Sequence, residues 1–268
     1  MTETTKTRTG TNLIPFRDTG PYSARNSSKG ALIAEAGRIV AGLSSGLGIG
    51  DLRTRALNGE ILPQRARSTR ERIWDALHYL YLSQPAWGLA DLQTAYAIGP
   101  QSREFVSLLY LHYALRDHLA YDFVTEVLWV KWGQQQRAVS PQDVLFLLDQ
   151  AAEGQPQIQR WSASTRAKLA TTIPTALRDL GVLEGVQKKS LVRPALPLST
   201  AEHLLRILIT EGLRGIEVLR DATWRLFFCQ ENDVAGLLAR LAQERRIRFE
   251  RVGTTVVLDT PTEWSVSL

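Results

Sequence analysis

The chain contains 268 residues, of which 44% are hydrophobic and 22% are charged, a composition that excludes an intrinsically disordered protein. Its one cysteine excludes an intrachain disulfide and a metal site built from several thiolates. The net charge of +5 is a mild basic excess, which indicates a nucleic-acid partner only weakly. No apolar run approaches the ~18 residues of a membrane-spanning helix, and the polar N-terminus lacks the apolar segment of a secretory signal. We therefore expect a cytoplasmic protein with no membrane partner.

Charge is distributed unevenly along the chain. Residues 31–90 carry seven basic and five acidic groups, whereas residues 91–153 carry four and eight. Residues 154–198 carry seven basic and two acidic groups, and residues 199–268 carry nine and ten. The basic excess therefore lies on either side of an acidic middle.

Apolar residues recur at three- and four-residue spacing along most of the chain after Gly30, which predicts helices. Before that point the sequence is polar and threonine-rich, and we expect residues 1–20 to form a flexible arm. Pro174 lies inside one expected helix, so a kink or an early end is expected there. The expected helices, in chain order, span residues 30–44, 51–57, 68–80, 88–97, 102–117, 121–132, 141–152, 164–180, 200–211, 216–228 and 234–244.

Two short segments have the character of strands. Residues 188–193 follow a stretch punctuated by glycine and could pair as a small β-ribbon. Residues 245–259 alternate apolar and polar side chains and turn near Gly253, which predicts a β-hairpin. Helices followed by a terminal hairpin are typical of a winged helix.

These elements predict a mainly α protein. We expect a helical bundle of helix-turn-helix-like units, with a small β-ribbon or wing at the C-terminal side of each half. Beyond the arm, the chain divides into an N-terminal helical domain (21–135) and a C-terminal helical domain (136–268). The hairpin at 245–259 belongs to the second domain and resembles the wing of a winged helix.

A short pattern occurs twice in the sequence. Each copy reads as the end of a helix, a glycine turn, basic residues and a new helix capped by serine. The copies are Asn58-Gly59, Gln64-Arg65, Ser68-Thr69-Arg70 and, 95 to 96 residues later, Glu153-Gly154, Gln159-Arg160, Ser164-Thr165-Arg166. The pattern indicates two helix-turn-helix-like units, with chance similarity as the alternative in so short a run.

Basic side chains gather at the start of both repeated helices. The N-terminal end of a helix attracts phosphate through its unpaired N–H groups and its dipole. A basic helix start combined with a basic ribbon is how helix-turn-helix modules contact a DNA backbone. A solvated surface with intrahelical ion pairs is the alternative interpretation. The candidate DNA-binding residues are Arg65, Arg67, Arg70, Arg72, Arg160, Arg166, Lys168, Lys188, Lys189 and Arg193.

No residue pattern points to catalysis. His112 and His118 are six residues apart, which places them on different faces of a helix, and neither lies in a His-Glu-x-x-His motif. Asp117, Asp122 and Glu126 are more simply a solvated acidic face. We therefore expect no enzyme, no metal, no cofactor and no small-molecule substrate.

Several segments resemble a known family. Tyr22-Ser23 and the run Gly30-Ala31-Leu32-Ile33-Ala34-Glu35-Ala36-Gly37-Arg38-Ile39-Val40 resemble the opening of the BrxA proteins of bacteriophage exclusion (BREX) systems. Arg67-Ser68-Thr69-Arg70 and Trp161-Ser162-Ala163-Ser164-Thr165-Arg166 fall where that family has two similar helix starts, and the resemblance covers about residues 20–200. It implies a small, cytoplasmic, non-enzymatic component of a phage-defence operon, working beside a DNA methyltransferase, a phosphatase-like protein and large ATPases. It also implies DNA binding and a helical fold like that of the antitermination factor NusB.

The leading hypothesis is a DNA-binding accessory protein of a BREX system that contacts the backbone of double-stranded DNA. A protein–protein adaptor is the second hypothesis, in which the acidic middle and the turn-adjacent Trp132 and Trp161 dock other BREX subunits. An RNA-binding module like an antitermination factor is the third. Binding to duplex DNA, single-stranded DNA and RNA would discriminate among them.

Overall fold

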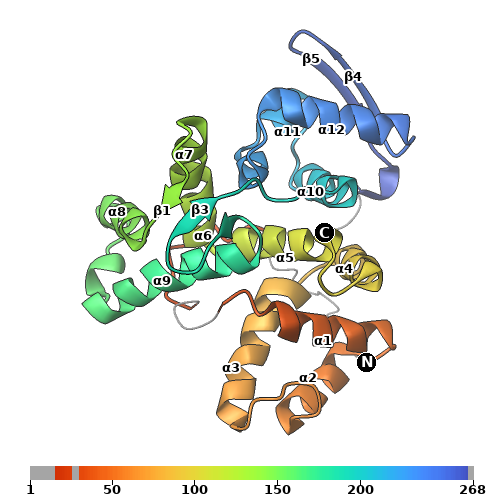
Figure 1. Cartoon of the computed structure of the whole chain (residues 1–268). Coiled ribbons are helices and arrows are strands. Elements are labelled where there is room, and N and C mark those ends of the chain that lie inside the picture. The colour runs from red at the N-terminus through yellow and green to blue at the C-terminus, as the bar shows by residue number, and fades with distance from the viewer. Residues whose placement is uncertain (1–15, 26–29, 265–268) are drawn as a thin grey trace, which may run out of the picture.

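The structure, a computed structural model, describes residues 16–25 and 30–264, and it is mainly helical as the sequence predicts (Figure 1). The longer helices are α1 (Ile33–Ser44), α2 (Ile49–Asn58), α3 (Arg67–Leu77), α4 (Ala86–Ile98), α5 (Arg103–Arg116), α8 (Pro141–Ala151), α9 (Ala163–Asp179), α10 (Leu198–Thr210) and α12 (Glu231–Gln243). The shorter α-helices are α6 (His118–Asp122), α7 (Trp129–Gly133) and α11 (Ile216–Arg220). One π-helical turn, η1 (His78–Leu82), continues α3, and another, η2 (Phe123–Leu128), joins α6 to α7. Three 3₁₀ turns, η3 (Ile158–Arg160), η4 (Ala222–Phe227) and η5 (Thr262–Trp264), complete the helical elements.

Two small antiparallel sheets accompany the helices. The expected ribbon forms from β2 (Leu183–Glu184) and β3 (Lys189–Leu191), and β1 (Ala138–Val139) pairs with the other edge of β3. The expected terminal hairpin forms from β4 (Arg248–Val252) and β5 (Thr255–Asp259). This hairpin projects beyond α12 in Figure 1. Strands therefore form in both expected segments, and β1 and β2, which lie outside the predicted range of 188–193, were not predicted.

Helix α5 lies at the centre of the fold. Phe105 and every residue from Ser107 to Arg116 are buried, so this helix has no solvent-facing side beyond its first turn. A helix that is apolar nearly all round is buried on all sides. In Figure 1, α5 lies between α1–α4 below and α10–α12 above, and buried side chains from all of these helices belong to one hydrophobic cluster.

The expected end of one helix is wrong, and the early end expected at Pro174 in another does not occur. The helix expected over residues 216–228 ends at Asp221, whose backbone is extended at ψ 134° and whose carboxylate accepts from Thr223 N at 2.9 Å, starting the separate turn η4. Helix α9 does not end early at Pro174 but continues to Asp179. Pro174 and the residue before it, Ile173, are both buried, so tertiary packing compensates for the hydrogen bond that proline cannot make.

Residues 16–20, expected to belong to a flexible arm, are instead held against the helices. Residues 1–15 lie outside the described residues, but from Phe16 onward the chain is packed against the helices. Phe16 is buried beside Trp87, with ring centroids 5.6 Å apart. Arg17 forms ion pairs with Glu211 at 2.7 Å and with Asp221 at 3.2 Å. We call residues 16–25 the strap, because they run from the ends of α10 and α11 to α6.

The strap is fixed to α6 by a protonated histidine. His118 Nδ1 lies 2.6 Å from Gly20 O, and His118 Nε2 lies 3.2 Å from Asp122 Oδ2. Both partners are hydrogen-bond acceptors, so both ring nitrogens must carry a proton. The hydrogen bond to Asp122 is the largest of the effects that raise the pKa of His118 to about 9.

This arrangement predicts a loss of stability at alkaline pH. A histidine whose pKa is raised from about 6.5 to about 9 contributes stability that is complete below pH 6.5 and is lost as the pH rises toward 9. Urea unfolding between pH 6.5 and 9.5 should show this decline in the wild type, and the His118→Gln variant should show a smaller one. Equal declines in the two proteins would contradict the assignment.

Candidate nucleic-acid interface

The first repeated unit is a helical hairpin made by α2 and α3, which pack against each other. Helix α2 ends at Gly59, whose φ of +88° is the left-handed conformation that terminates helices. Helix α3 then starts at Arg67, with Ala66 in the capping position and no side chain capping its N–H groups. The expectation that Ser68 caps this helix is therefore wrong by two residues, because Ser68 already lies in the first turn.

Arg70 holds this helical hairpin together. Its Nε donates to Leu57 O at 2.8 Å, and its Nη1 donates to Gln64 O at 2.6 Å and to Arg65 O at 2.8 Å. These carbonyls belong to the end of α2 and to the linker before α3. In this geometry the Arg70 guanidinium positions the linker, and three of its N–H donors are used by the protein.

Other basic side chains of the same helical hairpin face solvent. Arg65 is exposed, and Arg67 keeps 70% of its side chain exposed while pairing with Glu71 one turn away. Arg72 is also exposed and donates to Ser68 O at 3.3 Å. Two exposed arginines of α2 add to this set and were not singled out from the sequence, although they flank the buried Leu52 and Ala56. The first basic surface thus consists of Arg53, Arg55, Arg65, Arg67 and Arg72.

The second repeated unit, α8 and α9, has the same construction. Ser162, and not Ser164, caps α9, and its Oγ accepts from Thr165 N at 3.1 Å. Arg166 is the fourth residue of α9, as Arg70 is of α3, and it also reaches back to the preceding helix, where it pairs with Asp149. Both repeated arginines therefore tie a helix start to the helix before it.

The remaining candidate cations divide into exposed and engaged groups. Arg160, Lys168 and Lys188 are exposed, and no side-chain partner is found for them among the described residues. Lys189 donates from Nζ to Val186 O at 3.1 Å. Arg193 contacts Cys229 Sγ at 3.7 Å and Asp233 at 3.6 Å, which ties it to the C-terminal segment. The second basic surface consists of Arg160, Lys168 and Lys188.

The two basic surfaces do not merge into one patch. In Figure 1 the start of α3 lies at the lower end of the molecule, beside the α2–α3 linker, whereas the start of α9 lies at its left edge. The sequence repeat therefore corresponds to two similar helical hairpins at separate places in the fold. A ligand that touches both must be extended.

The C-terminal hairpin and helices present a different electrostatic surface. Helix α12 begins with Glu231 and carries Asp233 in its first turn, which favours helix stability but repels phosphate. Arg220 and Arg251 both pair with Glu231, at 3.0 and 2.5 Å. This part of the protein therefore lacks the basic helix start seen in α3.

Two of the four histidines lie together in the core. His112 and His203 are both buried and in contact, whereas His118 binds the strap. Within residues 16–25 and 30–264, no group of three or more His, Cys, Asp or Glu side chains is arranged to hold a metal ion. The same described residues include no helix that is both long and apolar enough to span a membrane.

Comparisons with known proteins identify first the fold and then the family. One solved structure, the crystal structure of an uncharacterized protein from Magnetospirillum magneticum, has the same fold with a TM-score of 0.61 and 16% sequence identity, covering 78% of this chain and 100% of that one. The BrxA family model matches residues 20–207. The chain therefore belongs to the BrxA family, as its resemblance to BrxA proteins of BREX phage-defence systems predicted. No curated protein matches the chain.

Proposed function

We propose that the protein is a non-enzymatic component of a BREX phage-defence system that contacts the backbone of double-stranded DNA. The observation that carries the proposal is the pair of equivalent helical hairpins, each of which exposes several basic side chains around a helix start. Phosphate oxygens bind well to such side chains, and the positive end of the helix dipole adds to the attraction. Family membership supports a role in phage defence and other BREX subunits as partners.

Binding of this kind does not depend on DNA sequence. The linker of residues 59–66 between α2 and α3 is longer than the short turn of a helix-turn-helix that inserts its second helix into the major groove. Arg70, which lies on the first turn of α3, directs Nε and Nη1 to protein carbonyls, which holds its guanidinium against the linker. The contacts we propose are therefore to phosphates, which position a protein without specifying sequence.

Affinity for duplex DNA should fall steeply with salt. Each phosphate contact releases counterions, so log K falls with log salt by about 0.9 for every contact on B-DNA. Fluorescence anisotropy with a labelled duplex, measured between 50 and 200 mM salt, should give a slope that is the same for unrelated sequences. An affinity that does not change with salt would refute the proposal, and tighter binding to single-stranded RNA would favour the antitermination-like alternative.

A protein–protein adaptor remains the second candidate, and one surface favours it. Val252 is 81% exposed and Val257 is 38% exposed, and both lie on the outward face of the β4–β5 hairpin. Exposed apolar side chains on an unpaired hairpin are typical of protein contacts. If the protein binds no duplex at low salt, docking of another BREX subunit becomes the leading function.

A further inference from the structure

A chain of three polar side chains joins α4, α5 and α10. The Nε2 atoms of His112 and His203 lie 2.9 Å apart, and His203 Nδ1 lies 2.6 Å from Asp91 Oδ2. His112 is 1% exposed and the side chain of His203 is 0% exposed, whereas the Asp91 side chain is 42% exposed. Trp87 covers the His203 ring, with centroids 5.0 Å apart. The DNA surfaces proposed above use none of these residues.

The geometry limits how many protons the two histidines can hold. An ionised carboxylate only accepts hydrogen bonds, so His203 Nδ1 carries a proton toward Asp91. The 2.9 Å contact between the two Nε2 atoms has room for one proton, donated by either ring. With both rings neutral, His112 donates to His203, and with one extra proton, the charged ring is His203, beside Asp91. A second extra proton would place two N–H groups face to face, and the contact would break.

The surroundings also oppose a charge on His112. Burial, followed by the neighbouring His203 and Arg116, lowers the pKa of His112 well below its ordinary value. The charged groups on the three helices are Asp91 on α4, Arg103, Glu104 and Arg116 on α5, and Glu202 and Arg206 on α10. Arg116 donates to Ser83 O at 2.5 Å, and Arg206 lies over the Trp87 ring at 4.2 Å. Asp91 is the one carboxylate bonded to the pair, and it is bonded through His203.

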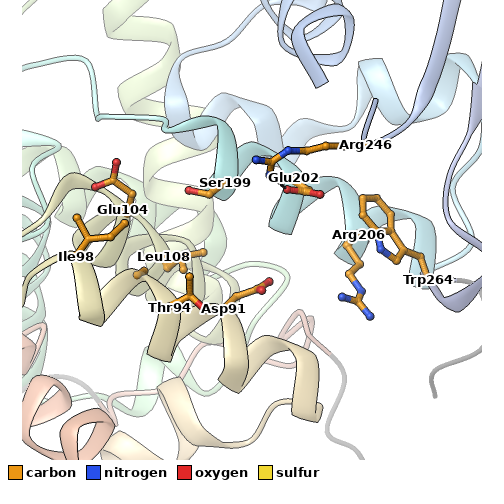
Figure 2. A pocket seen from close by; sticks show the side chains of 11 residues that line it. Asp91, Thr94, Ile98, Glu104, Leu108, Ser199, Glu202, Arg206, Arg246 and Trp264 are labelled. Carbon is orange, nitrogen blue, oxygen red and sulfur yellow. Dashed lines mark hydrogen bonds and ion pairs between the residues drawn. The ribbon is translucent and has the colours of Figure 1, made fainter. Parts of the chain in front are cut away.

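These contacts attach the C-terminal segment, residues 198–264, to the rest of the fold. Beside the histidine pair, Ser107 Oγ on α5 lies 2.6 Å from Thr200 Oγ1 on α10. Figure 2 shows Asp91 and Arg206 on facing helices around a cavity of about 230 Å³ that Glu202, Arg246 and Trp264 also line. Because Asp91 borders this cavity, protons can reach the buried pair without unfolding the core. These polar contacts form a titratable seam within an interface between the segment and α4 and α5 that is otherwise apolar.

We propose that His112, His203 and Asp91 form a proton-operated latch that holds the C-terminal segment on α4 and α5 at neutral pH and releases it on acidification. The seam accommodates one added proton, with the resulting charge on His203 beside Asp91, and opens when His112 must also become charged. Once α10 moves away, His112 reaches water and its pKa returns toward the ordinary value. Acid therefore favours the open state, as linkage requires for a group whose pKa is lowered in the closed state.

Amide hydrogen exchange on the full chain tests the latch. Deuterium uptake by peptides from α10 and α9 should be measured from pH 7.5 to pH 5. Labelling times are scaled so that the intrinsic exchange is equal at every pH. Below about pH 6.5 the opening constant of α10 should rise by about tenfold per pH unit, as expected for uptake of one proton, while α9 stays protected. Protection of α10 that does not change with pH would overturn the proposal.

Three variants separate the latch from general acid instability. In His112→Gln the amide cannot titrate, so the pH dependence of α10 should flatten, whereas His78→Gln, which removes an exposed histidine, should behave as the wild type. Asp91→Asn, at a half-exposed site, removes the charge that stabilises the first proton and should shift opening to higher pH. If His112→Gln does not fold, the Asp91→Asn shift decides the question. A pH dependence in folded His112→Gln as steep as in the wild type, or an unchanged midpoint in Asp91→Asn, would contradict the latch.

Discussion

Changing Arg67 and Arg72 together to glutamate should weaken duplex binding by at least about tenfold at physiological salt and lower the salt slope by about two units. Both side chains are exposed on the first two turns of α3, and the N–H groups at the start of this helix have no side-chain cap. A phosphate at this position would lose two cationic contacts and meet two carboxylates instead. Fluorescence anisotropy over a range of salt concentrations measures both quantities.

A matched control makes this result specific to the first basic surface. Arg103 and Arg240 are exposed on α5 and α12, and neither forms an ion pair with a described residue. Changing both to glutamate alters the net charge by the same amount at distant positions. If the control variant loses as much affinity as the α3 variant, and both melt at the wild-type temperature, the effect is one of overall charge and the proposed surface is wrong.

Arg70→Ala should be the most destabilising change among the arginines of the first helical hairpin, lowering the free energy of unfolding by about 2–4 kcal/mol. The change removes three hydrogen bonds donated by a charged group. The carbonyls of Leu57, Gln64 and Arg65 then lose the guanidinium as their donor. DNA affinity should fall in parallel, because the linker that carries Arg65 is no longer fixed. Urea unfolding and anisotropy on the same preparation measure the two losses.

Two comparisons test the positioning role of Arg70. Lysine has no planar fork of donors, so Arg70→Lys should recover little of the lost stability. Arg166→Ala should cost at most about 1 kcal/mol, because its partner Asp149 is 66% exposed and surface ion pairs contribute little. An Arg70→Ala variant that unfolds like the wild type but has lost DNA binding would instead identify Arg70 as a direct phosphate contact.

The helices were predictable because their causes are local. Apolar spacing, glycine stops and proline at Pro141 are encoded within a few residues, and α8 begins there with a capping box on Ser140. The repeated helical hairpins were also visible, since Arg70 and Arg166 occupy the same position in their helices. What the pattern did not reveal was the role of these arginines, because it depends on carbonyls that converge only after the linker has folded.

Long-range contacts could not be predicted from the sequence, for the same physical reason. His112 and His203 are 91 residues apart, and each looks like an isolated histidine on an apolar helix. The sequence predicts a flexible arm for residues 16–20 of the strap because their partners lie far along the chain, as those of Arg17 do at Glu211 and Asp221. Exposed cations such as Arg53 and Arg55 were passed over because they occur outside the repeated motif.

Protection of lysines by bound DNA tests the central claim most directly. Amine acetylation of the full chain, read by mass spectrometry with and without saturating duplex, should show Lys168 and Lys188 shielded at 50 mM salt and reactive again at high salt. Lys131, which pairs with Asp143 at 2.7 Å and belongs to neither basic surface, should react equally in both samples. If duplex is bound while Lys168 and Lys188 remain fully reactive, the DNA lies elsewhere on the protein and the second helical hairpin is not part of its binding surface.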